Sequence, residues 1–277
     1  MTALIQGYAT VLDNVPLARA TYCLRLREPQ LAAAIKPGQF VMLALGGTTD
    51  PLLARPFALF DTVLDEHELP SGIDIGYQVV GKMTTIMASL RAGDALRFWG
   101  PLGNSFPDLD GIDHVGLVAG GIGQTPFLAY TRQLLGQRAY GSSKFPRRMA
   151  QRVSLYYGVR SADLLAGVKE FEKAGAQVRV ATDDGSAGFH GFVTELVERQ
   201  EKPQHLIGCG PEPMMRALAV LAARWQVPCH LSLESPMACG LGICFSCVTR
   251  VKTGDGWDYR RVCVDGPIFD AATLAWE

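Results

Sequence analysis

Four cysteines late in the chain have a spacing that suits iron–sulfur chemistry. Cys239, Cys244 and Cys247 follow the pattern C-x4-C-x2-C, and Cys263 comes after the intervening stretch 248–262. Zinc sites built from four cysteines usually contain two C-x2-C pairs, and only one such pair is present here. The observed pattern is typical of plant-type [2Fe–2S] clusters, with a zinc-stabilised binding module that has no redox activity as the alternative.

Two glycines inside this stretch, Gly240 and Gly242, favour the iron–sulfur interpretation. Four thiolates, two sulfides and two ferric ions carry a net charge of about −2, so backbone N–H groups must converge on the sulfur atoms. Glycine allows the loop to adopt positive φ angles and to approach the cluster closely.

The composition indicates a soluble globular protein of about two domains. The chain has 277 residues, of which 48% are hydrophobic and 19% charged, and its formal net charge of −1 does not favour nucleic acid as a partner. No basic and apolar leader opens the sequence, and no apolar run is long enough to span a membrane, so we expect a cytoplasmic protein. Thiols stay reduced in the cytoplasm, and seven cysteines suit a disulfide framework poorly.

Two turns that contain glycine predict a nucleotide site. In AGGIGQTP, Gly121 and Gly123 follow an apolar run and precede a helical stretch, which suits a dinucleotide pyrophosphate, although Pro126 replaces the third Rossmann glycine. A later turn, Cys209–Gly210–Pro211, also follows an apolar run. We expect both turns at the carboxyl edge of a parallel sheet, where Cys209 either faces a nicotinamide or is a small core residue.

Two further groups of residues have side chains or backbone suited to anions. Arg55 in RPFA is able to pair with a phosphate, or is an ordinary surface arginine. Gly81, Lys82, Thr84 and Thr85 lie where a short helix is expected, and they form either another anion site or a plain N-cap.

The elements that must position these residues change character along the chain. Short runs rich in β-branched and aromatic residues, separated by turn signals, predict an antiparallel β-barrel with one short helix at 84–90. From residue 112 onward, apolar strands alternate with helices, which predicts a parallel sheet covered on both faces. We therefore expect an α+β multidomain protein with a barrel domain at 1–108, an α/β nucleotide domain at 109–233 and a cysteine module at 234–277. The expected barrel strands are YATVLDN, ATYCLRLRE, GQFVMLAL, RPFALFDTV, IDIGYQVV and DALRFWG.

Together, these motifs resemble those of the ferredoxin–NADP reductase superfamily and, more closely, those of the electron-transfer subunits of class B dihydroorotate dehydrogenases. The cysteine block with its DGP tail is the most specific feature of the resemblance. In chain order, the similar segments are KPGQFVML, RPFALFD, GYQVVGKMTT, GPLGNSF, AGGIGQTP, TDDGSAGFHGFVTEL, GCGPEPMMRAL, ESPMACGLGICFSCV and YRRVCVDGPIFD.

The resemblance implies FAD in the barrel, NAD in the α/β domain and a [2Fe–2S] cluster on the cysteines. It places Arg55 at the flavin pyrophosphate, within the motif Arg55–Pro56–Phe57, and it shows Ala58 where the family often has a serine that reaches flavin N5. The implied site residues are Gly81, Lys82, Thr84 and Thr85 for the second flavin loop; Gly121, Gly123, Cys209, Gly210 and Pro211 for the nicotinamide; and Cys239, Cys244, Cys247 and Cys263 for the cluster.

The function implied by the resemblance is electron transfer between NAD(H), FAD and the cluster, to or from the FMN of a dihydroorotate-oxidising catalytic subunit in pyrimidine biosynthesis. The partner would be that subunit, in a hetero-oligomer, and we expect no acid–base or nucleophilic catalytic residue in this chain. Asp183 and Asp184 in TDDGS favour NAD over NADP, because they would repel a 2′-phosphate placed near them. The alternative is a subunit of a complex of the NADH-dependent ferredoxin:NADP reductase type or the sulfide dehydrogenase type.

Overall fold

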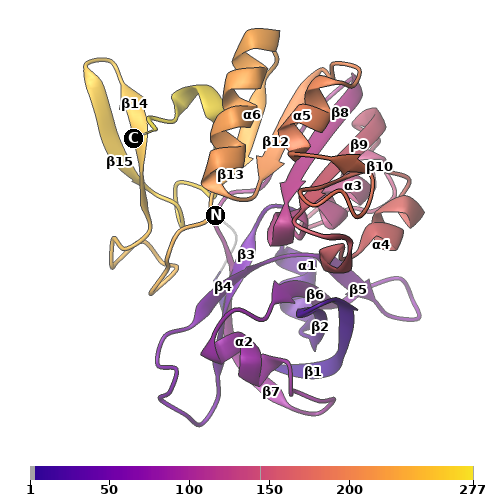
Figure 1. The fold of residues 1–277 in the computed structure, drawn as a ribbon. Helices are drawn as coiled ribbons and strands as arrows, with labels where there is room; N and C mark the ends of the chain where they lie inside the picture. Colours follow the sequence, from indigo (N-terminus) through magenta and orange to yellow (C-terminus); the bar gives the residue numbers. More distant parts are fainter. Residues whose placement is uncertain (1–3, 144, 277) are drawn as a thin grey trace.

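The structure is a computed structural model that describes residues 4–143 and 145–276. Its first part is a seven-stranded antiparallel sheet in the order β4-β3-β7-β1-β2-β6-β5, which lies at the bottom of Figure 1. The sheet packs around one apolar core that also takes in the helices α1 and α2, and it confirms the expected antiparallel β architecture. Its elements are β1 (Ile5–Ala18), β2 (Thr21–Arg27), α1 (Pro29–Ala34), β3 (Phe40–Leu45), β4 (Arg55–Ala58), β5 (Asp61–Leu64), β6 (Pro70–Gln78), α2 (Lys82–Met87) and β7 (Ala95–Leu102).

The run RPFALFDTV, expected as one strand, forms two strands at opposite edges of this sheet. β4 pairs with β3, whereas β5 pairs with β6. Leu59 and Phe60 between them are both buried, which breaks the alternation of a single strand. The Leu59 N–H donates to the Gln39 carbonyl (3.1 Å) and the Phe60 N–H donates to the Asp74 carbonyl (2.9 Å). Consecutive residues therefore connect the two edges of the sheet.

The second sheet carries the nucleotide-domain pattern, with the strand order β11-β10-β9-β8-β12-β13-β16. All its pairings are parallel except that between β13 and β16, which is antiparallel. Two glycine-containing turns follow the ends of the adjacent strands β8 and β12, so they lie at one edge of the sheet as expected. The strands are β8 (Ile112–Gly120), β9 (Ala150–Val159), β10 (Gln177–Thr182), β11 (Phe189–His190), β12 (His205–Cys209), β13 (Cys229–Ser232) and β16 (Ile268–Asp270).

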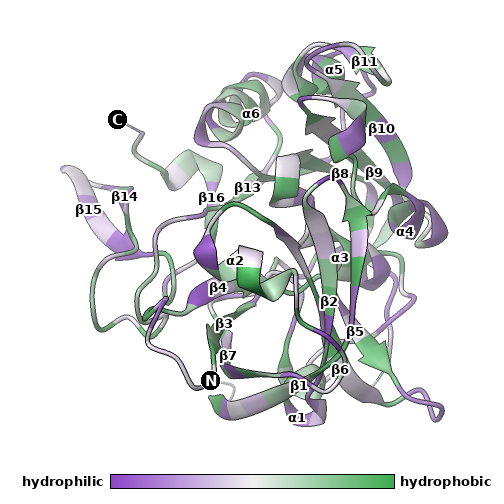
Figure 2. Ribbon diagram, turned by 60° about the horizontal axis from the view of Figure 1, so that its bottom comes forward, coloured by the Kyte–Doolittle hydropathy of each residue, from purple (hydrophilic) through white to green (hydrophobic). Residues whose placement is uncertain are grey.

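Helices cover both faces of the second sheet, as its strand sequences require. α3 and α4 pack together on one face, and α5 and α6 pack together on the other. Figure 2 shows α4 and the hairpin described below largely in hydrophilic colours. No helix within the described residues has the length and apolar character needed to cross a membrane. The helical elements are η1 (Gly121–Gln124), α3 (Phe127–Leu134), η2 (Ala162–Leu164), α4 (Val168–Lys173), α5 (Val193–Glu198), α6 (Glu212–Trp225) and η3 (Ala271–Thr273).

The C-terminal segment contacts both sheets. Its hairpin, β14 (Val248–Thr253) and β15 (Gly256–Arg261), stands apart in Figure 1, but β16 joins the edge of the second sheet. The indole N–H of Trp99, in β7, donates to the Cys239 carbonyl (2.9 Å). The side-chain amide of Asn104 donates to the Ile268 carbonyl (2.8 Å). The cysteine segment is therefore held against the barrel and the nucleotide domain together.

A buried ionic cluster joins the barrel to the stretch around α3. Asp61, in β5, is almost fully buried. Its carboxylate accepts hydrogen bonds from Arg138 (3.0 Å) and from the Tyr140 hydroxyl (2.7 Å). Arg132 lies at an ion-pair distance of 2.9 Å from the same carboxylate, without a well-aligned hydrogen bond from its Nε. Burial, and then the Asp61 charge, raise the pKa of Tyr140 well above its usual value.

We expect Asp61→Asn to lower the free energy of unfolding by about 3 kcal/mol, because two partly buried guanidinium groups lose their counter-charge. The measurement is urea unfolding of the cofactor-loaded protein, followed by circular dichroism. Asp110→Asn is the matched control, since Asp110 forms only an exposed ion pair with Arg147 (3.4 Å). Equal unfolding midpoints for the two variants would contradict the role assigned to Asp61.

Candidate functional site

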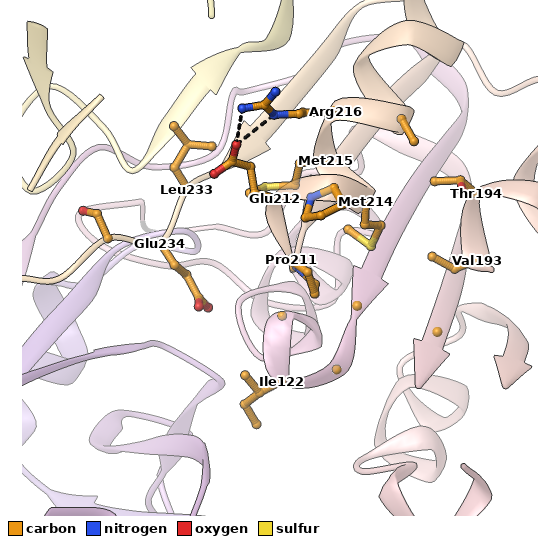
Figure 3. A pocket seen from close by; sticks show the side chains of 18 of the residues that line it. Ile122, Val193, Thr194, Pro211, Glu212, Met214, Met215, Arg216, Leu233 and Glu234 are labelled. Atoms are coloured by element: carbon orange, nitrogen blue, oxygen red, sulfur yellow. Dashed lines mark hydrogen bonds and ion pairs between the residues drawn. The ribbon is translucent and has the colours of Figure 1, made fainter. Parts of the chain in front are cut away.

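Two connected cavities lie where the barrel meets the nucleotide domain. The barrel pocket, of about 550 Å³, is lined by β4, by the start of α2 and by the segment after β13. The cleft, of about 1200 Å³, runs along the carboxyl edge of the second sheet and reaches the hairpin. Figure 3 shows the part of the cleft at the start of α6. The residues that line both cavities are Gln78, Val80, Ile122, Leu233, Glu234, Ser235 and Pro236.

The predicted flavin motif lines the barrel pocket. Arg55 is exposed, and its Nη1 donates to the carbonyls of Leu53 (2.8 Å) and Ala54 (3.1 Å), so the guanidinium is oriented by its own loop. Phe57 packs edge-on against Tyr77, with 6.3 Å between the ring centroids. Pro56 and Ala58 also line the pocket, and Ala58 supplies no hydroxyl there.

The second predicted flavin loop forms the start of α2. The Thr84 hydroxyl accepts hydrogen bonds from the N–H groups of Val80 (3.0 Å) and Gly81 (3.1 Å). The Thr85 hydroxyl donates to the Gly81 carbonyl (3.0 Å), and Lys82 pairs with Asp50. Both threonines therefore stabilise the turn itself, while Gly81, Lys82 and Thr84 line the barrel pocket.

The two glycine-containing turns pack directly against each other. A Cβ atom on Gly123 would lie 2.3 Å from the Cys209 carbonyl oxygen, so Gly123 is required by this contact between turns. A Cβ atom on Gly210 would likewise lie 2.9 Å from the Cα of Gly120, so this glycine also allows the two turns to touch. Gly121 has φ +57° and open space around it, at the wall of the cleft. Both predicted glycines line the cleft: Gly121 is open to it, whereas Gly123 is also packed against the Cys209 carbonyl.

Cys209 lies at the barrel pocket and is only 2% exposed. Cys209 is therefore buried, as expected of a core residue, and it also borders a cavity, as expected of a residue near a cofactor. Burial raises the pKa of its thiol well above the usual value, with the charge of Glu234 as the next cause. The thiol is consequently uncharged near neutral pH, and it does not act as a base there.

The structure brings the four predicted cluster cysteines together as two pairs. Cys239 lies close enough to Cys244 to lower the pKa of its thiol, and Cys247 lies close enough to Cys263 to raise the pKa of that thiol. Electrostatic coupling between Cys239 and Cys263 connects the pairs. The second pair is buried, whereas Cys244 is exposed, and all four thiols are free. Among the described residues, no three metal-ligating side chains converge closely enough to form a complete metal site.

Hydrogen-bond donors surround the cysteine pairs, as an anionic cluster requires. The Leu241 N–H donates to the Cys239 sulfur (3.3 Å), in a loop where Gly240 and Gly242 have φ +70° and +77°. Hydrogen bonds from Ser246, and then from Cys239, lower the pKa of Cys244 to about 6. Burial, and then Cys247, raise the pKa of Cys263 to about 12. Two thiol pairs with backbone donors fit a two-iron cluster better than a single zinc ion.

Sequence reasoning missed three residues that shape the site. Glu234 and Ser235 lie between the two cavities, and Trp99 fixes the Cys239 carbonyl. The sequence signals for Glu234 are its place at the start of ESPMACGLGICFSCV and directly after a strand that neighbours the Cys209 strand. Nothing in the sequence near Trp99 indicates its contact with the cysteine segment.

Known protein families match the same two parts of the chain, the cysteine segment and the nucleotide domain. A family model for the iron-sulfur cluster binding domain of dihydroorotate dehydrogenase B matches residues 234–275, and one for an oxidoreductase NAD-binding domain matches residues 117–219. The chain is 34% identical to a dihydroorotate dehydrogenase B (NAD(+)) electron transfer subunit from Desulforamulus reducens, over 97% of this chain and 98% of that one. It is 36% identical to the corresponding subunit from Caldanaerobacter subterraneus, over 94% and 95% of the two chains. The chain belongs to the family of dihydroorotate dehydrogenase B electron transfer subunits.

Solved structures agree with this membership. The structure of an NADH-dependent reduced ferredoxin-NADP oxidoreductase is similar with a TM-score of 0.81 and 26% identity, over 97% of this chain and 90% of that one. Phthalate dioxygenase reductase, at 20% identity and a TM-score of 0.59, shares the fold over 94% of each chain. The electron-transfer subunits of this family are therefore built on the same framework as the reductases.

We expect Gly123→Ala to weaken NADH binding about tenfold or more, because its methyl group would push the two turns apart at a cost of about 1–3 kcal/mol. Equilibrium fluorescence titration with NADH measures the change. Gly121→Ala meets no neighbour and carries only the cost of its positive φ, about 1 kcal/mol. Gly254→Ala, in open space at the hairpin, is the control. Unchanged binding by Gly123→Ala would rule out this role for the contact between the turns.

Proposed function

We propose that this chain is the NAD-linked electron-transfer subunit of a dihydroorotate dehydrogenase. It carries electrons between NAD(H) at the cleft and the FMN of a separate catalytic subunit that oxidises dihydroorotate. The observation that carries this proposal is the continuity of the cleft, the barrel pocket and the cysteine loop. Glu234 and Ser235 line both cavities, Met237 lines the barrel pocket, and Cys239 follows two residues later.

The proposed cofactors are FAD in the barrel pocket, NAD in the cleft and a [2Fe–2S] cluster on Cys239, Cys244, Cys247 and Cys263. When bound, the flavin exchanges two electrons with a nicotinamide and one at a time with the cluster. Arg55 presents a guanidinium to the flavin pyrophosphate, and the start of α2 forms the other wall of its pocket. Gly121 leaves room for the nucleotide backbone at the cleft wall.

Charges at the cleft support NAD rather than NADP. Asp183 lines the cleft, and its neighbour Asp184 is exposed. Hydrogen bonds from the Ser186 hydroxyl, and then from the Ser186 N–H, lower the pKa of Asp184, so this carboxylate is charged at neutral pH. Two adjacent carboxylates at this end of the second sheet disfavour the additional phosphate of NADP.

The proposed docking surface for the catalytic subunit is the loop patch, which consists of Leu241, Ile243, Phe245 and Val264. All four apolar side chains are exposed, and Ile243 reaches 76%. Ile243 and Phe245 are the sequence neighbours of Cys244, the exposed cluster cysteine, and Val264 lies next to the neighbouring Gly242. Exposed apolar side chains gathered around a redox site are typical of an interaction surface. A partner seated on the patch brings its own redox centre close to the cysteine loop and shields that loop from solvent.

We also propose a cytoplasmic location. None of the seven cysteines forms a disulfide in the structure, and a reducing compartment preserves that state.

Replacing Cys247 with serine is expected to abolish NAD-dependent dihydroorotate oxidation in the reconstituted complex, because the proposed cluster loses one of its four thiolate ligands. Iron and acid-labile sulfide should fall from about two of each per chain to background, while bound flavin and NADH-driven dye reduction remain. Metal analysis, visible absorbance and both activities provide the measurements. Cys23→Ala changes a buried cysteine outside the loop and should keep its iron. Full iron content in Cys247→Ser, or a single zinc in the wild-type protein, would refute the cluster assignment.

Ile243→Asp should reduce binding to the catalytic subunit at least tenfold, because a charge replaces a 76% exposed apolar side chain at the centre of the loop patch. Co-purification and titration of the two subunits measure the loss. Val220→Asp is the control, since Val220 is also 70% exposed but lies on α6. An equal effect of both substitutions would show that the loop patch is not the docking surface.

A further inference from the structure

The proposed function, on which this inference rests, leaves one proton to be placed. NADH yields NAD⁺, one proton and two electrons, and an iron–sulfur cluster accepts the two electrons one at a time without the proton. Electron export from the barrel pocket therefore leaves a proton behind, and the reverse direction requires one to be supplied. A protein group at the junction of the cavities can accept and return this proton if it titrates near neutral pH.

The titratable groups that line the barrel pocket leave one candidate. Arg55 carries a guanidinium group, which has no proton acceptor, and Lys82 pairs with Asp50. Burial raises the pKa of Tyr77 to about 12, and it raises that of Cys209 well above its usual value. Glu234 supplies the only carboxyl group among the described residues that line this pocket.

Glu234 also stands at the right place. It follows β13 and lines both the barrel pocket and the cleft. In Figure 3 its carboxyl group points toward the side of the cavity where Ile122 lies, away from the ion pair of Glu212 and Arg216. Within the described part of the chain, no hydrogen bond or ion pair fixes its carboxylate. The side chain is open to the cleft, yet the surrounding protein raises its pKa through burial.

Burial, rather than a neighbouring charge, is the cause of the raised pKa of Glu234, and one hydroxyl group lies beside it in the chain. The Ser235 hydroxyl is buried and has no hydrogen-bond partner. The charged and titratable groups that line the two cavities from the neighbouring elements are Arg55 (β4), Tyr77 (β6), Lys82 (α2), Tyr157 (β9), Arg160 (after β9), Asp183 (after β10), Cys209 (β12), Glu212 and Arg216 (α6), Arg250 (β14) and Tyr259 (β15). Of these, Cys209 has the clearest coupling to Glu234, and it is uncharged at neutral pH.

We propose that Glu234 is the proton-accepting residue at the junction of the two cavities. An O–H bond forms on its carboxylate as an N–H bond of the reduced cofactor in the barrel pocket breaks, while both electrons leave toward the cysteine loop. In the opposite direction, protonated Glu234 returns this proton before NADH is formed. Ala58, which has no hydroxyl, cannot serve as the proton relay.

The test separates the two half-reactions in the cofactor-loaded subunit by stopped-flow spectroscopy. In Glu234→Gln, reduction by NADH should stay within about twofold, while electron transfer to the cluster should slow about 100-fold and lose its pH dependence. Glu234→Asp should restore most of the rate. Glu172→Gln, on the exposed surface of α4, is the control. An unchanged export rate and pH profile in Glu234→Gln would overturn the proposal.

Infrared difference spectroscopy gives a readout that does not depend on turnover. The spectrum of the photoreduced wild-type protein on reoxidation should contain the C=O stretch of a newly protonated carboxyl group, and Glu234→Gln should lack it. If Glu234→Gln loses its cofactors, the wild-type spectrum still decides, because the absence of this band overturns the proposal. A failure of the proposed function is distinguishable, since the wild-type protein would then contain no flavin or no cluster.

Discussion

The site depends on how the segment from Glu234 to Cys247 is held between the two sheets. The Trp99 indole fixes the Cys239 carbonyl, and a Cβ atom on Gly240 would lie 2.7 Å from the Met42 side chain, so the loop rests directly on the barrel. The segment begins directly after β13, and β16, farther along the chain, pairs with β13, so both sides of the cysteine loop are anchored to the nucleotide domain. These contacts place the cysteine pairs beside the barrel pocket, and without them the loop would have no fixed distance to it.

The architecture was predictable from the sequence, because each sheet has its own hydrophobic period. Alternating strands and apolar parallel strands are local patterns, and both sheets formed as expected. The division of RPFALFDTV was not predictable, since the two strands differ only in which distant edge they pair with. The helix α1 was also missed, because its six residues are too few to show a helical period. The strand β16 was not predictable either, because it forms only by pairing antiparallel with β13, a distant part of the chain.

Within the site, local spacing was informative and contacts between distant segments were not. The four cysteines were identified because three of them lie within nine residues, 239–247. Gly123 was predicted from its place in a glycine-containing turn, and its packing against the Cys209 carbonyl, from a distant part of the chain, had no signal in the sequence. Glu234 opens the segment ESPMACGLGICFSCV, but nothing in that segment assigned it a role, and its position between two cavities exists only after the strands have assembled. Its lack of a fixed partner is likewise a property of the fold.

The two cysteine pairs have different surroundings, and this difference gives the loop a direction. Around Cys244, exposure to solvent and hydrogen bonds from Ser246 favour negative charge. Around Cys263, burial disfavours it. The exposed cysteine, Cys244, has the exposed apolar residues Ile243 and Phe245 as its sequence neighbours, whereas Cys247 and Cys263 are buried. The order of residues in one short loop thus brings one cysteine to the surface proposed for the partner and keeps two others in the interior.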